Sequence, residues 1–372
     1  MSLTTNTAAI SDLAFFRGRC ALTALLRSLG IGRGDQVATQ AFTCVAVPEA
    51  IKVSGASPLF VDIQSAGLNL DVEDLRAKWN PMVRAIIVQH TFGIPADMTA
   101  IMEFAQSQGV PVIEDCCHTL HSTYQGRPVG SFGCGAFYSF EWGKPLVAGI
   151  GGAAIVNSPE LHARMRAYHA RLVPPPVAQR LKLSAQYQAF RMLYRPAFYW
   201  ALRSAFHQLS RLGLAAGNYQ ADYDTDLESA EYRWQMAPQF QRRLVKKLRH
   251  LEERTRQQQT IATAYASTLG GRQVALPQAP LVSEPVLVRF PLMVEQKERL
   301  LANAQQEKVE VAGWYQHAIH PLPDEHAASL CYEHQSCPQA EQRAEEIISL
   351  PINGGVTERY RERVATLLEK SA

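Results

Sequence analysis

RAIIVQHTFGIPADMTAIMEFAQSQGVPVIEDCCH, residues 84–118, holds two apolar strands with one helical segment between them. Residues 84–90 and 110–115 are short apolar runs, whereas residues 98–108 repeat apolar side chains at helical spacing. Strands separated by a helix of this length are typical of a parallel sheet, because the helix carries the chain back to the edge where the first strand began. This stretch therefore predicts an α/β protein.

The same alternation continues on both sides of this stretch. Further helices are predicted at residues 20–29, 46–53 and 72–79, and further strands at residues 36–39, 58–62, 136–140 and 153–157. Residues 239–269 are predicted to form one long charged helix, and a βα pattern resumes after about residue 271. Together these segments predict a mainly parallel sheet with helices on both faces, followed by a smaller second domain.

Length and composition set the broad class of protein. The chain has 372 residues, enough for two domains that share one cleft, and its formal net charge of +3 is too small to indicate nucleic-acid binding. The amino terminus lacks the pattern of a signal peptide, and no run of about 18 uncharged apolar residues predicts a membrane span. Seven cysteines, an odd number, favour a reducing compartment over a disulfide framework, so we expect a cytoplasmic protein.

Polar side chains gather where the predicted strands end. His90 ends one strand, Asp115 ends the next with His118 just beyond it, and Ser139 lies in a third strand, shortly before Lys144. In open α/β sheets, ligands bind outside the carboxyl ends of the strands. The sequence therefore predicts the ligand site among these residues.

Asp115 and Lys144 have the side chains best suited to catalysis in this group. A carboxylate at the end of an apolar strand is costly to bury unless a positive group meets it, and a protonated pyridine nitrogen is one such partner. An amine attacks a carbonyl only when it is unprotonated, a state that desolvation beside Trp142 and Leu146 would favour. Taken alone, Asp115 could equally cap a helix, and Lys144 could be a surface residue in a glycine-rich turn.

In their order and spacing, several stretches resemble the nucleotide-sugar aminotransferases of the DegT/DnrJ/StrS type, which are fold-type I pyridoxal-phosphate enzymes. The resemblance runs from about Gly18 to Leu368 and rests on GRCALTALLRSLGIGRGDQV, GASPLFVDI, HTFGIPADM, VIEDCCHTLHSTYQGRPVGSFG, SFEWGK and SLPI. It implies a mainly parallel seven-stranded sheet flanked by helices, with a smaller C-terminal α/β domain. Residues 1–245 would then form the large cofactor-binding domain, and residues 246–372 a long helix and the small domain.

The resemblance also implies a function. It predicts a homodimeric aminotransferase that uses pyridoxal 5'-phosphate and moves an amino group, from glutamate, to a keto group of a nucleotide-linked sugar or a cyclitol. Relatives that carry out dehydration have His in place of the lysine, so Lys144 argues against that branch. Two alternatives stay open: dehydration or epimerisation on the same scaffold, and a non-catalytic regulatory or membrane-associated module.

The resemblance implies roles for four strand-end residues. Lys144 matches the lysine that holds the cofactor as an imine and later moves a proton between substrate and cofactor carbons. Asp115 matches the aspartate that pairs with the pyridine nitrogen. His118 matches a residue near the ring hydroxyl, and Ser139 matches a serine that binds the cofactor phosphate.

A phosphate turn is predicted at Gly18, Arg19 and Cys20, whose backbone amides open a helix where the dipole favours an anion. The family usually has Gly-Thr here, so Arg19 replaces a hydroxyl donor with a guanidinium that could rebuild the grip. An aromatic residue that stacks on the cofactor usually follows the position of Thr43, where this chain has Cys44.

The segment Glu231-Tyr232-Arg233 departs from the family as well. Members commonly have Asn before Tyr-Arg, and this Asn reaches the phosphate in the neighbouring subunit. A carboxylate at that position would repel a phosphate. Tyr232 and Arg233, together with His90 and His320, are predicted as substrate contacts.

Cys331, His334 and Cys337 lie close together in the sequence, with further histidines (His317, His320, His326) nearby. Structural zinc sites usually contain a pair of cysteines two to four residues apart, which this cluster lacks. In the family this segment is a surface loop that borders the substrate entrance. We therefore predict no metal site.

Residues 161–220 contain nine Lys or Arg and no Asp or Glu, together with many aromatic side chains. The family normally has fewer residues here, so a basic helical insertion is predicted at about residues 165–225. It could lie on an anionic membrane surface without crossing the membrane. It could also pack as a dimer arm or as a lid over the cleft, and we favour packing because such stretches are more often packed than lipid-bound.

Overall fold

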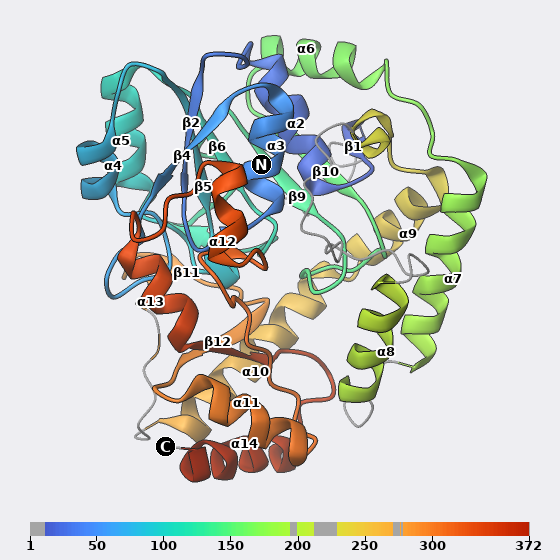
Figure 1. Cartoon of the computed structure of the whole chain (residues 1–372). Coiled ribbons are helices and arrows are strands. Elements are labelled where there is room, and N and C mark those ends of the chain that lie inside the picture. The colour runs from blue at the N-terminus through green and yellow to red at the C-terminus, as the bar shows by residue number, and fades with distance from the viewer. Residues whose placement is uncertain (1–11, 194–198, 212–228, 271–275, 277, 372) are drawn as a thin grey trace.

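The computed structural model describes residues 12–193, 199–211, 229–270, 276 and 278–371. Its centre is a seven-stranded sheet in the order β1-β10-β9-β6-β5-β2-β4 (Figure 1). These strands are β1 (Ala14–Phe15), β2 (Gln36–Gln40), β4 (Ser57–Val61), β5 (Val83–Gln89), β6 (Val112–Asp115), β9 (Gly135–Ser139) and β10 (Gly152–Val156). The strands from β9 to β4 run parallel, whereas β10 is antiparallel to both of its neighbours. The predicted mainly parallel seven-stranded sheet is confirmed, although the short strand β1 was not predicted.

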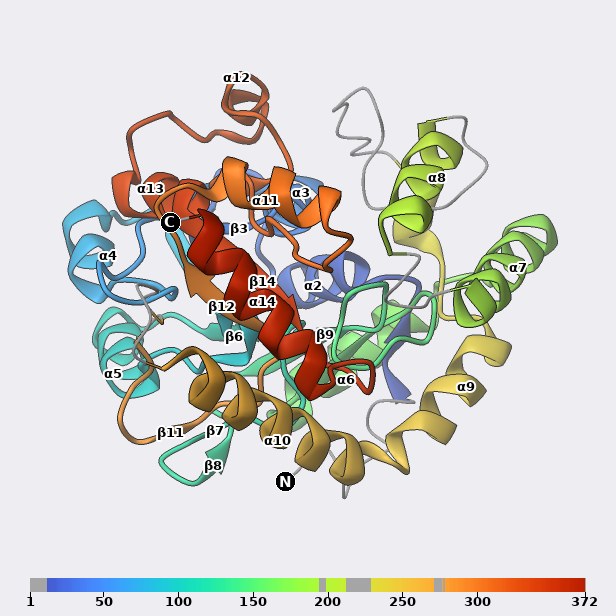
Figure 2. The same ribbon diagram turned by 90° about the horizontal axis from the view of Figure 1, so that it is seen from below.

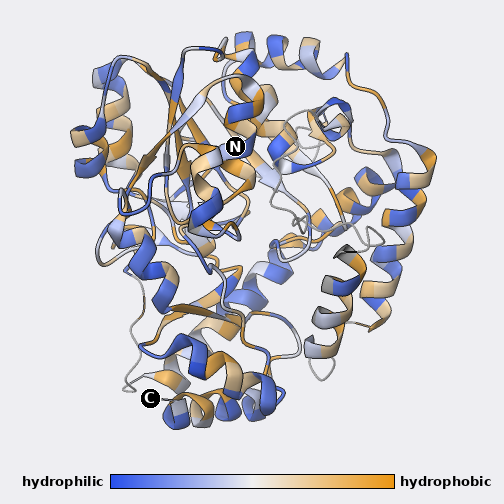
Figure 3. Cartoon of the chain, in the orientation of Figure 1, coloured by the Kyte–Doolittle hydropathy of each residue, from blue (hydrophilic) through white to orange (hydrophobic). Residues whose placement is uncertain are grey.

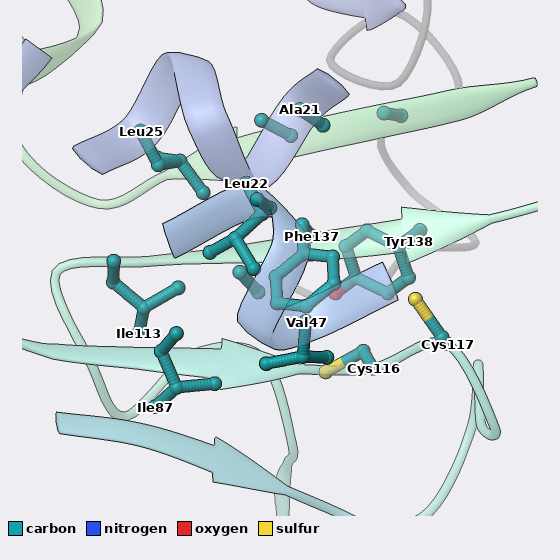
Figure 4. Close-up of a cluster of buried hydrophobic side chains, with 14 of the residues drawn as sticks. Ala21, Leu22, Leu25, Val47, Ile87, Ile113, Cys116, Cys117, Phe137 and Tyr138 are labelled. Atoms are coloured by element: carbon teal, nitrogen blue, oxygen red, sulfur yellow. The ribbon is translucent and has the colours of Figure 1, made fainter. Parts of the chain in front are cut away.

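Helices flank this sheet and bury its apolar side chains. They are α2 (Gly18–Ser28), α3 (Ala46–Ser54), α4 (Val72–Lys78), α5 (Met98–Gln108) and α6 (Pro159–His169). Leu22 and Leu25 of α2 lie over the sheet beside Ile113 of β6 and Phe137 of β9, in one buried cluster (Figure 4). Each such side chain contributes about 1.5–3 kcal/mol when it is fully buried. This packing holds the first residue of α2 next to the carboxyl ends of the strands.

Local signals set the ends of α5. The carboxylate of Asp97 accepts a hydrogen bond from the backbone N–H of Ala100, which caps the helix start. Gly109 follows with a φ of 66°, a left-handed conformation that glycine adopts without strain and that ends the helix. The observed bounds, Met98–Gln108, are those predicted.

The C-terminal part has its own small sheet and its own core. Strands β12 (Arg289–Met293) and β14 (Ile347–Pro351) pair antiparallel. Helices α10 (Leu251–Leu269), α11 (Lys297–Gln306) and α14 (Glu358–Ser371) pack around them, and α13 (Pro338–Glu346) leads into β14 (Figure 2). Tyr265, Leu292, Leu350 and Val364 are buried in this second core.

The expectation of one helix over residues 239–269 is wrong. The chain forms α9 (Pro238–Leu248) and α10, with a break at His250, whose φ of −107° and ψ of 18° are not helical. Side chains of α9, among them Phe240 and Leu244, join the core of the large sheet, whereas Tyr265 of α10 joins the C-terminal core. One straight helix could not bury its apolar side chains in both cores.

Short elements connect the parts. They are β3 (Thr43–Cys44), η2 (Thr91–Gly93), β7 (Thr123–Tyr124), β8 (Arg127–Pro128), η4 (Ala230–Arg233), β11 (Ser283–Glu284), β13 (Ile319–His320), α12 (Asp324–Ala327) and η5 (Ala328–Leu330). Strand β13 pairs parallel with β3. This pairing brings the C-terminal segment next to Cys44, near the carboxyl ends of the strands of the large sheet.

The predicted basic insertion contains two helices, α7 (Val177–Leu193) and α8 (Tyr199–Arg211). Residues 194–198 and 212–228 of this segment lie outside the described residues. The inner side of α7 contacts Trp142, whose ring centroid is 4.6 Å from that of Phe190. Trp200 of α8 donates a hydrogen bond to the carbonyl oxygen of Val309 at 2.9 Å. In the part of the chain described here, no helix is both long enough and apolar enough to cross a membrane.

Candidate active site

One cavity lies at the carboxyl ends of β5, β6 and β9, beside the first turn of α2. Its walls come from the sheet, from α2 and α3, and from one C-terminal residue. The lining residues are Gly18, Arg19, Cys44, Ala46, Val47, Gln89, Asp115, Cys117, His118, Phe137, Ser139, Glu141, Lys144 and Tyr315. The cavity therefore brings together the strand-end residues singled out in the sequence, except His90.

Asp115 is the last residue of β6 and is almost fully buried. Its Oδ1 accepts a hydrogen bond from the backbone N–H of Cys117 at 2.9 Å. Burial raises the pKa of this carboxyl group, although the Cys117 N–H and the Lys144 ammonium oppose the rise. A buried carboxylate in a cavity wall with so little compensation is suited to hold a further positive group.

Lys144 lies half-buried in the turn after β9, and its Nζ is 5.4 Å from the centroid of the Trp314 ring. Its positive charge acts on the pKa values of Asp115, Cys44 and His118, so the amine lies near all three. The aromatic ring beside the amine is Trp314, whereas Trp142 packs on α7.

His118 is a neutral hydrogen-bond donor in the wall of the cavity. Its Nδ1 accepts a hydrogen bond from the backbone N–H of Phe92 at 3.2 Å, so the proton of the neutral ring is on Nε2. Burial lowers the pKa of His118 well below its usual value, and the charge of Lys144 adds to this effect. The ring of Trp314 covers one side, with the two centroids 4.8 Å apart.

The first turn of α2 lies beside Ser139 and has features that suit an anion. Arg17 precedes the helix without a side-chain cap, and the first turn holds no acidic residue. A Cβ on Gly18 would lie 3.0 Å from the Cβ of Ser139, so glycine is needed for the helix start to approach the strand this closely. Unpaired backbone N–H groups and the helix dipole favour an anion here.

Arg17 ties three segments together behind this turn. Its Nη1 lies 2.7 Å from Glu141, in the same turn as Lys144, and its Nε lies 2.6 Å from Glu231 in η4. Arg17 and Glu141 are both buried. Glu231 therefore binds an arginine of its own chain, which offsets the repulsion predicted for a phosphate.

Arg19 is also paired. Its guanidinium forms an ion pair with Glu49 of α3, and Tyr232 lies close enough to Arg19 for each to act on the pKa of the other. Burial raises the pKa of Glu49, against the opposing effect of Arg19. The guanidinium of Arg19, which was predicted to bind a phosphate, is thus already paired with the carboxylate of Glu49.

A family model matches the chain over most of its length. The model of the DegT/DnrJ/EryC1/StrS aminotransferase family matches residues 11–184 and 207–369. The chain belongs to this family. The stretch left unmatched, residues 185–206, falls in α7, α8 and the link between them, where the insertion was predicted.

Individual relatives agree with membership of the DegT/DnrJ/EryC1/StrS family. The chain is 28% identical over 356 residues to UDP-N-acetyl-3-dehydro-alpha-D-glucosamine 3-aminotransferase of Acidithiobacillus ferrooxidans, covering 95% of this chain and 82% of the relative. It is 38% identical over 148 residues to L-glutamine:2-deoxy-scyllo-inosose aminotransferase of Streptoalloteichus tenebrarius, covering 40% and 35% of the two chains. The structure of S. venezuelae DesV in complex with a ketimine intermediate superposes with a TM-score of 0.73 at 25% identity, over 96% of this chain and 84% of DesV.

The chain is accordingly a pyridoxal-phosphate-dependent aminotransferase of fold type I. The residues of the cavity fit this cofactor. A buried carboxylate, Asp115, is available for a ring nitrogen, and the Nε2–H of His118 is available for a ring oxygen. Gly18 leaves the space that a Cβ would fill beside Ser139, where a phosphate would meet the helix start. Lys144 would supply the amine.

Several other predicted residues lie outside the cavity wall. His90 is fully buried, with its Nε2 3.3 Å from Glu114 and its Nδ1 accepting from the backbone N–H of Ala96 at 3.2 Å, so we leave it out of the proposed site. Arg233 is exposed in η4. His320 lies in β13 and is buried. Burial lowers the pKa of His320 well below its usual value, and the charge of the nearby Lys144 adds to this effect.

Within the described residues, the cysteines and histidines noted between residues 317 and 337 form no group of three potential ligand atoms. Cys331 is exposed, Cys337 is buried, and His334 lies 3.4 Å from Glu341. Among the described residues, a different group, His90, Glu114 and Cys116, brings three potential ligand atoms together. The carboxylate of Glu114 already accepts backbone hydrogen bonds (from Gly130, Phe132 and Gly133) and therefore holds the following loop in place.

Several residues in and beside the cavity were not predicted from the sequence, among them Gln89, Glu141, Trp314 and Tyr315. Gln89 and Glu141 could have been identified from their positions in the sequence, because Gln89 ends β5 and Glu141 shares the turn of Lys144. The amide oxygen of Gln89 accepts a hydrogen bond from the Thr43 hydroxyl at 2.7 Å. No sequence pattern identifies Trp314 and Tyr315 as site residues. They belong to the C-terminal segment, which the pairing of β13 with β3 brings to the cavity.

Proposed function

We propose that the chain transfers an amino group from glutamate to a keto group of a nucleotide-linked sugar or a cyclitol, with Lys144 and Asp115 as its catalytic residues. The observation that carries this proposal is their placement in one cavity wall with His118 and the start of α2. The names of the two curated relatives support the acceptor class, since one acts on a UDP-linked keto sugar and the other on an inosose.

When bound, pyridoxal 5'-phosphate would supply an aldehyde carbon for the amino group and a pyridinium ring that withdraws electrons from the reacting carbon. Asp115 would keep the proton on the ring nitrogen, because its buried carboxylate gains a cationic partner there. The Nε2–H of His118 would donate to the ring oxygen. The amides at the start of α2 and the Ser139 hydroxyl would bind the phosphate.

Lys144 would carry the proton that amino transfer requires. Its free amine would be the base within the cavity that takes a proton from the donor carbon, and the resulting ammonium would return a proton on the cofactor side. The ring of Trp314 lies beside this amine, with its centroid 5.4 Å from Nζ. Tyr315 belongs to the same wall and narrows the cavity from the C-terminal side.

Glutamate alone tests the reaction class, because the first half of an amino transfer needs no acceptor. The holoenzyme mixed with glutamate should release 2-oxoglutarate in an amount equal to the cofactor present, and the Lys144→Ala variant should release none. Glutamine should be run in parallel, since one relative is named for that donor. Dehydration or epimerisation would release no 2-oxo acid, so its absence with both donors would contradict the proposal.

We also propose a cytoplasmic homodimer in which each site lies near the subunit interface, as the resemblance implies. Sedimentation equilibrium of the holoenzyme measures the assembly, and an active monomer would contradict it. We also propose a large and a small domain. The boundary predicted after residue 245 falls inside α9, and we place it at the break between α9 and α10. This division is supported by two of the three buried clusters, one built on the large sheet and the other around β12 and β14. The third cluster joins the two parts, for example through Phe42 and Tyr315.

A further inference from the structure

The outer face of α7 is apolar, although it faces solvent. Val177, Leu181 and Met192 are each at least 60% exposed, and Ala185 and Ala189 between them are exposed as well. These positions recur at helical spacing and form one stripe along the helix. The opposite side is the packed one: Leu183 and Tyr187 are buried there, and the guanidinium of Arg243 lies 3.6 Å from the centroid of the Tyr187 ring.

Apolar exposure is concentrated in this part of the chain. In the described residues, six of the ten exposed large apolar side chains lie in or next to α7 and α8, namely Val173, Val177, Leu181, Met192, Leu193 and Leu209. Helix α7 lies at the outer edge of the molecule in both views, and both helices show apolar and polar faces (Figures 1, 2 and 3). A contiguous apolar face of this kind indicates a surface that contacts another body.

The charged residues beside the apolar stripe indicate what kind of partner it contacts. Lys182 lies on one flank of the stripe and Arg191 on the other, by helical spacing, and residues 161–220 contain nine cations and no acidic residue. The neighbouring helix α9, which contacts Tyr187 through Arg243 and Lys247, also has several cations and no acidic residue. An apolar stripe bordered by cations matches the interface of an anionic lipid surface.

A second copy of the arm matches this surface less well. In a two-fold symmetric contact the same patch faces itself, so the cations of one arm would lie against those of the other. Like charges brought together in this way repel, and the described helices α7 and α8 contain no carboxylate to compensate. We therefore propose that the outer face of α7 docks on an anionic membrane surface, with the stripe from Val177 to Met192 in the headgroup region and the flanking cations on lipid phosphates.

Vesicle flotation of the full-length protein tests this inference. The protein should float with vesicles of equal parts phosphatidylcholine and phosphatidylglycerol and should stay behind with phosphatidylcholine alone. Leu181→Ser combined with Met192→Ser should weaken the partitioning at least about tenfold, because two apolar side chains are lost from the interface. Arg191→Gln should weaken it about fivefold, and added salt should weaken binding of the wild type.

Leu281→Ser is the matched control, since Leu281 is fully exposed but lies far from α7 in the sequence and outside the basic segment. It should float like the wild type, and unchanged melting temperatures should show that all variants are folded. Equal binding to neutral vesicles, no binding to either kind, or equal loss in the control would each overturn the inference. So would a dimer that the Leu181→Ser, Met192→Ser variant abolishes without any vesicle binding, because the occupant would then be a second copy.

Discussion

Arg17 and Glu141 form a buried ion pair, with 2.7 Å between Nη1 and Oε2. Arg17 immediately precedes the start of α2, where we propose that the cofactor phosphate binds, and Glu141 lies in the turn that carries Lys144. The second partner of the same guanidinium, Glu231, lies in η4. One side chain thus links the start of α2 to the turn that carries Lys144, the lysine that we propose to be catalytic.

Arg17→Met should destabilise the fold. The variant leaves Glu141 and Glu231 without their cation, and breaking a buried ion pair from one side typically costs about 3–5 kcal/mol. Urea unfolding of the cofactor-free protein measures this loss. Arg84→Met is the control, because Arg84 is exposed in β5. Equal unfolding free energies for the two variants would show that the buried pair contributes nothing.

Glu49→Gln should tighten cofactor binding. The change removes a negative charge beside the phosphate turn and releases the guanidinium of Arg19, so the dissociation constant of pyridoxal 5'-phosphate should fall about fivefold. Because burial raises the pKa of Glu49, the difference from the wild type should shrink as the pH is lowered and Glu49 takes up a proton. Absorbance titration of the cofactor-free protein measures the affinity, with the exposed Glu73→Gln as control. Weaker binding in Glu49→Gln would mean that the Glu49 carboxylate is needed to orient Arg19.

Asp115→Asn should slow amino transfer while leaving the cofactor bound. An amide cannot keep a proton on the ring nitrogen, so the rate of 2-oxoglutarate release should fall by a factor of about 100 or more. Stopped-flow absorbance of the half-reaction measures the rate, and borohydride reduction checks that the cofactor is still attached. A rate within a few fold of the wild type would remove Asp115 from the catalytic residues.

Lys297 should make the fold more stable as the medium becomes alkaline. Burial lowers its pKa from 10.5 to about 8, while its Nζ donates to the carbonyl oxygens of Tyr315 and Ala344 at 2.7 and 2.5 Å. Between about pH 8 and pH 10.5, the unfolded chain binds more protons than the folded chain. The free energy of unfolding therefore rises with pH in this range, by on the order of 3 kcal/mol at most.

Denaturant unfolding at pH values spanning this window measures the effect. Lys297→Met should flatten the rise, whereas Lys246→Met, at an exposed position in α9, should keep it. The interpretation is wrong if the wild type and Lys297→Met show the same dependence on pH.

The sequence predicted those features that depend on local patterns. Apolar runs located six of the seven strands of the large sheet, and the rule that ligands bind at strand ends led to Asp115 and Lys144. Trp314 and Tyr315 could not be found in this way, because two-residue strands such as β13 have no periodicity to read. The break at His250 was missed because the residues on both sides favour a helix, and only the separation of the two cores divides them.

Borohydride reduction of the holoenzyme, followed by peptide mass spectrometry, tests the central claim most directly. Reduction should leave the cofactor covalently attached to the peptide that contains Lys144, and the Lys144→Ala variant should yield no modified peptide. Attachment to another lysine, such as the buried Lys297, or no attachment in the wild type, would contradict the assignment of Lys144 as the catalytic amine.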